Sequence, residues 1–138
     1  TNGIRLTKEL CAELVQAELD SVQVTFYSAD PDIHNELVGG AHYEETVAGI
    51  RNAVTAGINL SINTPLCSLN KDYLETLKFL HNLGVRYVTC SGLIITGNAR
   101  TDESVRTQLS GEQLYQVLKE AAGYCYANNM EINFTSPG

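Results

Sequence analysis

The sequence is poor in basic residues. Nine lysines and arginines stand against sixteen aspartates and glutamates, which gives a net charge of -7 and a pI near 4.8. Proteins that bind a nucleic acid backbone need a basic surface to neutralise its phosphates, and this composition offers none. We therefore expect no nucleic acid partner.

The sequence also lacks the apolar runs that membrane segments need. No stretch approaches the roughly 20 consecutive apolar residues of a membrane span. The opening TNGIRLTKEL lacks the charged-then-apolar order of a signal peptide. We therefore predict a cytoplasmic protein without a membrane partner. A chain of 138 residues, 43% of them hydrophobic, is long enough for one core, and we predict a single domain over residues 1–138.

Close pairs of cysteines are absent as well. The four cysteines, Cys11, Cys67, Cys90 and Cys125, are separated by 56, 23 and 35 positions. Disulfide frameworks and zinc sites use closely and regularly spaced cysteines, so this spacing indicates neither. We interpret all four as buried thiols and predict no metal ligand in this chain.

The spacing of apolar residues changes along the chain between a period of about two, typical of strands, and a period of about 3.6, typical of helices. Short segments rich in β-branched and aromatic residues predict strands at 22–27, 58–63, 85–90 and 130–134. Helical stripes of apolar residues precede or separate them. Gly57 and Gly84 are placed as helix stops, Asn70 as a helix N-cap, and Ser110 with Gln113 as a capping box. The pattern predicts an α/β fold of parallel β/α units, because strands joined by helical crossovers run parallel.

Parallel β/α units build either an open doubly wound sheet or part of a (β/α) barrel. A complete barrel has eight strands and about 250 residues, and four strands are predicted here. The TNG turn at residues 1–3 is of the kind that follows a strand, yet it leads directly into a helix. We therefore predict the C-terminal portion of a larger barrel, truncated on its N-terminal side.

Ligands of parallel α/β folds bind at the carboxyl ends of the strands. In this sequence those ends are residues 25–30, 63–67 and 90–99. The strand-end residues Thr25, Asn63 and Cys90 carry hydroxyl, amide and thiol groups, and none of them is a lysine or a carboxylate. An aldolase-like or other general acid/base barrel would need a lysine or a carboxylate there, which disfavours that class without excluding it.

Four segments in this order resemble a known family. They are TNG before a helix, VQVTFYSADPDIHNELVGG, GINLSINTPLCSLN and GVRYVTCSGLIITGNA. Together they resemble the core of a radical S-adenosylmethionine (radical SAM) enzyme, most closely the branch that matures peptides. The resemblance covers nearly the whole chain. It implies a partial (β/α)6 TIM-like barrel that binds S-adenosylmethionine beside a [4Fe-4S] cluster.

The family holds its cluster with a Cys-x3-Cys-x2-Cys loop, and this loop is absent here. The resemblance therefore implies that both cofactors belong to a longer parent, and that neither is bound by this chain alone. By resemblance, the cofactor-binding positions are Thr25, Asn63 and Leu93, on the ribose and adenine side of the pocket. No catalytic residue is assigned. His34 is predicted to fix its loop, and Asn2 to belong to a turn.

Three functions remain open from the sequence. The resemblance implies a parent oxidoreductase that cleaves S-adenosylmethionine to a 5′-deoxyadenosyl radical and abstracts hydrogen from a peptide or other small molecule. This segment would be inactive alone. The alternatives are an aldolase-like or phosphate-binding TIM-barrel fragment and a non-enzymatic α/β binding module. Because the strand at 22–27 would lack a neighbour on one side, we also predict a homo-oligomer formed through that edge.

Overall fold

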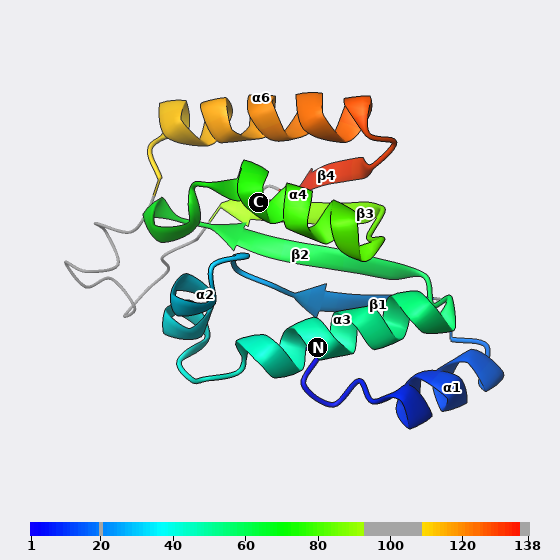
Figure 1. Ribbon diagram of the computed structural model, residues 1–138. Coiled ribbons are helices and arrows are strands. Elements are labelled where there is room, and N and C mark those ends of the chain that lie inside the picture. Colours follow the sequence, from blue (N-terminus) through cyan, green and yellow to red (C-terminus); the bar gives the residue numbers. More distant parts are fainter. Residues whose placement is uncertain (20, 93–108, 136–138) are drawn as a thin grey trace.

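The computed structural model describes residues 1–19, 21–92 and 109–135 (Figure 1). Its centre is a four-stranded sheet in the order β1-β2-β3-β4, in which every neighbouring pair is parallel. The strands are β1 (Val22–Thr25), β2 (Leu60–Leu66), β3 (Tyr87–Gly92) and β4 (Glu131–Thr135). The predicted parallel β/α architecture is confirmed, and it is consistent with part of a TIM-like barrel.

The described residues form five α-helices and one short 3-10 helix. The helices are α1 (Lys8–Gln16), α2 (Pro31–Val38), α3 (Tyr43–Ala56), η1 (Ser68–Asn70), α4 (Tyr73–Leu83) and α6 (Gly111–Ala127). None of them is long and apolar enough to cross a membrane. The pattern of apolar stripes predicted four of the α-helices; α2 is the additional one, and it begins at the Asp-Pro step of the loop after β1.

Local sequence signals explain where most helices begin and end. The Asp30 side chain accepts hydrogen bonds from the N–H groups of the first turn of α2, and Pro31 occupies the first helical position. Gly57 and Gly84 end α3 and α4 with φ angles of 76° and 97°, a left-handed conformation that favours glycine. Ser110 caps α6 in the predicted capping box with Gln113.

Several predicted boundaries are wrong: β1 ends at Thr25 and not at residue 27, and β3 covers 87–92 and not 85–90. Asn70 is not the N-cap of α4: it ends η1, and Asp72 precedes α4 instead. The strand predicted at 58–63 is β2 at 60–66, because Ile58 still donates to the carbonyl of Ala53 in the C-terminal cap of α3. Pro65 is tolerated near the end of β2 because β1 pairs with that strand only as far as Asn63.

The sheet has two chemically different faces. Side chains on one face, among them Val24, Ile62 and Val88, are buried in one core with apolar residues of α3, α4 and α6. The intervening residues, such as Thr25, Asn63 and Thr89, are polar and contribute nothing to that core. Helices therefore cover one face, and the other face presents polar side chains.

Candidate functional site

A row of polar residues crosses the sheet on the face opposite the core. Thr25 is the register partner of Asn63, Asn63 of Thr89, and Thr89 of Asn133. The first three are half-buried and Asn133 is exposed. Since in-register neighbours on parallel strands project from the same face, these four residues form a continuous polar strip. Two of the three predicted binding residues, Thr25 and Asn63, are thus brought side by side.

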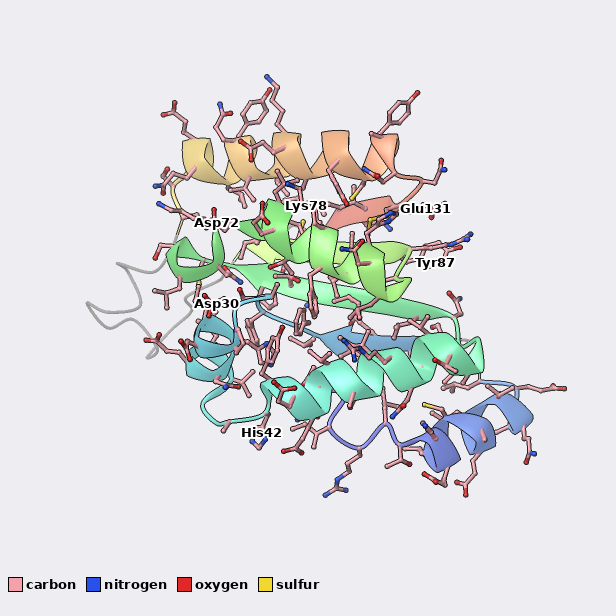
Figure 2. The ribbon with its side chains drawn as sticks, viewed as in Figure 1. Asp30, His42, Asp72, Lys78, Tyr87 and Glu131 are labelled. Carbon is pink, nitrogen blue, oxygen red and sulfur yellow. The ribbon has the colours of Figure 1, made fainter. Side chains whose placement is uncertain are left out.

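The strip lies toward the carboxyl ends of the strands. Thr25 is the last residue of β1, and Asn63 is level with it although β2 continues to Leu66. Figure 2 shows Tyr87 and Glu131, which begin β3 and β4, at one end of the sheet, and Asp30 and Asp72 at the other. The prediction that Asn63 ends its strand is therefore wrong, but its level in the sheet matches that of Thr25.

Side-chain hydrogen bonds connect three members of this face. The Thr89 hydroxyl donates to Oδ1 of Asn63 at 2.8 Å. Nε2 of Gln23 reaches across β2 and donates to the same Thr89 hydroxyl at 3.4 Å. Thr89 and Gln23 are not among the predicted binding residues; the sequence signal for them is a polar residue at every second position of adjacent strands.

The chain before α1 lies along the free side of β1. The amino group of Thr1 donates to the carbonyl of Gln23 at 3.0 Å, and the carbonyl of Thr1 accepts from the N–H of Thr25 at 2.9 Å. This is the pattern of a parallel strand pair centred on Val24. Asn2 forms a local turn, in which its Oδ1 accepts from the N–H of Ile4, as predicted. Thr1 therefore occupies the position of a neighbouring parallel strand beside β1.

The backbone that follows β1 is fixed by side chains from several elements. Residues 26–29 receive hydrogen bonds at almost every step, so this segment is held firmly although it is not a strand. The partners are the Thr64 hydroxyl for the Phe26 carbonyl, His34 Nδ1 for the Tyr27 N–H, Thr76 Oγ1 for the Ala29 N–H, and the Tyr43 hydroxyl for the Ala29 carbonyl.

Asn70 joins the carboxyl ends of β1 and β2. Its Nδ2 donates to the carbonyls of Tyr27 and Pro65 at 2.8 and 2.9 Å, and its Oδ1 accepts from the N–H of Cys67 at 2.7 Å. The residue is buried. All three bonds go to main chain, so Asn70 holds two strand ends at a fixed separation and leaves none of its amide groups for a ligand.

His34 fixes the loop after β1, as the sequence predicted. The imidazole is 1% exposed and lies among the rings of Phe26, Tyr27 and Tyr43, with centroid separations of 5.0 to 5.8 Å. Burial, followed by the nearby His42, lowers the pKa of His34 to about 4. A neutral ring can accept the Tyr27 N–H, whereas a protonated ring has no acceptor nitrogen. His34 is therefore a structural acceptor at neutral pH.

Asn35, where many members of the resembled family carry Asp, has a structural role here. Its Oδ1 accepts from the N–H groups of His42 and Tyr43 at 3.0 and 2.9 Å. These are N–H groups at the start of α3, for which His42 supplies no side-chain cap. Asn35 thus caps α3 from the preceding helix.

The cysteines do not form a cluster site. All four are buried, and burial raises the pKa of Cys90 to about 12 and that of Cys125 to about 11. Iron–sulfur clusters are held by thiolates, which these environments disfavour. Within the described residues no three His, Cys, Asp or Glu side chains gather as metal ligands. A [4Fe-4S] cluster therefore does not fit the described part of this chain.

Leu93, the third predicted binding residue, lies outside the described residues. Its assignment to the adenine side of a pocket stays a prediction.

One hollow of the described chain lies elsewhere. It measures about 490 Å³ and is lined by residues of the α4–β3 and α6–β4 connections, including His81, Arg86 and Asn129. These connections enter the sheet at the amino ends of the strands. Because parallel α/β folds bind ligands at the carboxyl ends, we place the candidate site on the polar strip and not in this hollow.

Comparison with known proteins identifies a family that matches this chain. Residues 1–80 match the family described as the Radical SAM superfamily. A probable GTP 3′,8-cyclase of Sulfurisphaera tokodaii is 27% identical to 99% of the chain, over 47% of its own length. A GTP 3′,8-cyclase of Rhodopseudomonas palustris is 29% identical to 89% of the chain, over 38% of its own length.

The chain thus spans less than half the length of these curated relatives. The family match covers α1, β1, α2, α3 and β2, and it extends into α4. It includes Thr25, Asn63 and the loop residues that fix the carboxyl end of β1. On this match, together with the parallel β/α architecture, the chain belongs to the radical SAM superfamily.

Proposed function

We propose that this chain is part of a longer radical SAM enzyme and supplies the surface that holds the ribose and adenine of S-adenosylmethionine and faces the substrate. The observation that carries the proposal is the in-register strip Thr25–Asn63–Thr89 on the sheet face that the described helices leave uncovered. Hydroxyl and amide side chains at that position suit the hydroxyls and ring nitrogens of a nucleoside.

Membership in the superfamily implies S-adenosylmethionine and a [4Fe-4S] cluster as cofactors of the longer enzyme. When bound, the two cofactors would supply radical chemistry by reductive cleavage of S-adenosylmethionine, for abstraction of hydrogen from the substrate. The residues described here would bind and orient the ribose and adenine of S-adenosylmethionine. Thr25 would offer a hydroxyl and Asn63 an amide, while the loop at 26–29, fixed by His34 and Asn70, would keep both strand ends in place.

For the substrate we propose a nucleotide first. The relatives that align with 99% and 89% of this chain are both named for a cyclase of GTP. A peptide, which the likeness to the peptide-maturing branch suggested, is the alternative. Formation of 5′-deoxyadenosine by the reduced full-length enzyme, measured with and without GTP, separates the two. Stimulation by GTP supports the nucleotide, whereas unchanged turnover at saturating GTP would refute it.

The binding role is tested by replacing Asn63. In the full-length, cluster-loaded protein, Asn63→Ala should weaken S-adenosylmethionine binding by roughly 1 to 3 kcal/mol, because buried polar partners lose a hydrogen bond. Isothermal titration without a reductant gives the affinity. Asn59→Ala is the matched control, since Asn59 is exposed and lies before β2 at the opposite end of the strand. Equal affinity of wild type and Asn63→Ala would defeat the assignment.

The aldolase-like alternative finds little support in the described residues. Such an enzyme needs a lysine or carboxylate that projects from a strand near its carboxyl end. The polar strip carries threonine and asparagine side chains only. Asp30 and Asp72 lie at that end of the sheet, but Asp30 is used as a helix cap and both are exposed.

A further inference from the structure

Asn63 is restrained by a neighbour that no resemblance singles out. Thr89 lies in register with it on β3, and the Thr89 hydroxyl donates to Oδ1 of Asn63 at 2.8 Å. A hydroxyl has one proton to donate, and here that proton is used by the Asn63 oxygen. Gln23 donates to a lone pair of the same hydroxyl at 3.4 Å, which favours the same orientation of the proton.

This bond determines which end of the Asn63 amide is presented to a ligand. The carboxamide is planar, so its NH2 group points away from the oxygen that Thr89 holds. Within the described residues, Nδ2 of Asn63 donates no hydrogen bond. The side chain is half-buried on the uncovered face, which leaves its two donors available there.

We propose that Thr89 is a positioning residue that turns Asn63 into a dedicated hydrogen-bond donor toward the nucleoside of the bound cofactor. The inference rests on the proposed function and deepens it, because it assigns the chemistry of the contact. The ligand atom beside Asn63 is an acceptor, such as a hydroxyl oxygen or an unprotonated ring nitrogen. Without the Thr89 bond, the amide could rotate and present its oxygen instead.

Three substitutions isolate this role. Thr89→Val keeps the size and β propensity of the side chain and removes the hydroxyl. Thr89→Ser keeps the hydroxyl and removes a methyl group. Asn63→Asp keeps an oxygen for Thr89 to donate to, but it removes both donors. Each is made in the full-length, cluster-loaded protein, and the probe is S-adenosylmethionine titrated calorimetrically in the absence of reductant.

We expect Thr89→Val to weaken binding about three- to tenfold, the effect of one lost hydrogen bond of ordinary strength. Thr89→Ser should bind within about twofold of wild type, and Asn63→Asp should bind at least as weakly as Asn63→Ala. A double-mutant cycle is the decisive readout. If Thr89 acts through Asn63, Thr89→Val will have no further effect in the Asn63→Ala background.

The outcomes separate this inference from the proposed function. If Asn63→Ala weakens binding but Thr89→Val does not, or if Thr89→Val costs the same with and without Asn63, the positioning role is refuted and the proposed site stands. If Asn63→Ala itself binds normally, both fail. Should Thr89→Val lower the urea midpoint, Thr89→Ala in the same cycle provides the second test, since the coupling to Asn63 does not depend on overall stability.

Discussion

The side-chain amide of Asn70 donates to the carbonyl of Tyr27 at 2.8 Å, which links the end of β2 to the loop after β1 across 43 positions of sequence. The same buried side chain makes two more bonds to main chain, at Cys67 and Pro65. Since the candidate binding residues Thr25 and Asn63 lie just before these points, Asn70 preserves the spacing of the site without facing a ligand.

Replacement of Asn70 should therefore be costly. Asn70→Ala leaves the Cys67 N–H and two carbonyls without their partner, and we expect a loss of about 2 to 4 kcal/mol in unfolding free energy. Urea denaturation measures it. The control is Asn82→Ala, at an exposed position of α4, which should change stability by less than about 0.5 kcal/mol. Equal midpoints for the two variants would contradict the anchoring role.

His34 should make stability depend on pH. Its folded pKa of about 4 lies below the unfolded value of 6.5, so between these values the unfolded chain binds a proton that the folded chain does not. Its contribution is complete above about pH 6.5, falls as the pH drops toward 4, and changes no further below that. The total loss is up to about 3 kcal/mol.

Carboxylates titrate in the same range, so the measurement compares wild type with His34→Gln at each pH. At pH 7 the wild type should be the more stable, because it keeps the bond to the Tyr27 N–H. The difference in unfolding free energy should then shrink steadily between pH 6.5 and 4. A difference that stays constant over this range would show that His34 is not held neutral by burial.

Gly49 allows the N-terminal segment to lie against α3. A Cβ at this position would overlap the carbonyl oxygen of Gly3 and lie 3.2 Å from Cβ of Leu6. We expect Gly49→Ala to destabilise the protein by more than about 2 kcal/mol, because backbone and not a flexible side chain would have to move. Gly123→Ala is the matched control in α6, where a Cβ meets nothing within 4 Å. It should stabilise by about 0.5 to 1 kcal/mol.

The edge of β1 is less open than the sequence suggested. We expected a row of unpaired backbone groups, but the Gln23 carbonyl and the Thr25 N–H are bonded to Thr1. A homo-oligomer through this edge stays a prediction, and it requires Thr1 to be displaced. Multi-angle light scattering of the 138-residue chain tests it: a dimer that persists when Thr25, whose N–H faces this edge, is replaced by proline would refute pairing there.

The sequence by itself determined the order and kind of elements. The spacing of apolar residues changes between a period of two and a period of 3.6, and Gly57, Gly84 and the Ser110–Gln113 box mark helix ends. Both signals depend only on residues close together in sequence, so they can be recognised without knowledge of the fold. Parallel strands followed, because helical crossovers return the chain to the same end of the sheet. Burial of the four cysteines was predicted from their spacing, and the loop role of His34 from the resemblance to the family.

Only the tertiary structure decided which polar residues meet. Register between strands depends on how α3 and α4 pack, so no local pattern aligns Thr25, Asn63 and Thr89, which are far apart in sequence. The same holds for Asn70: the sequence predicted a helix N-cap there, which is wrong, and its partners lie in the loop after β1 and in β2. Hydrogen bonds between residues far apart in sequence depend on how the elements pack. The bond from Thr89 to Asn63 could therefore be identified only in the folded chain.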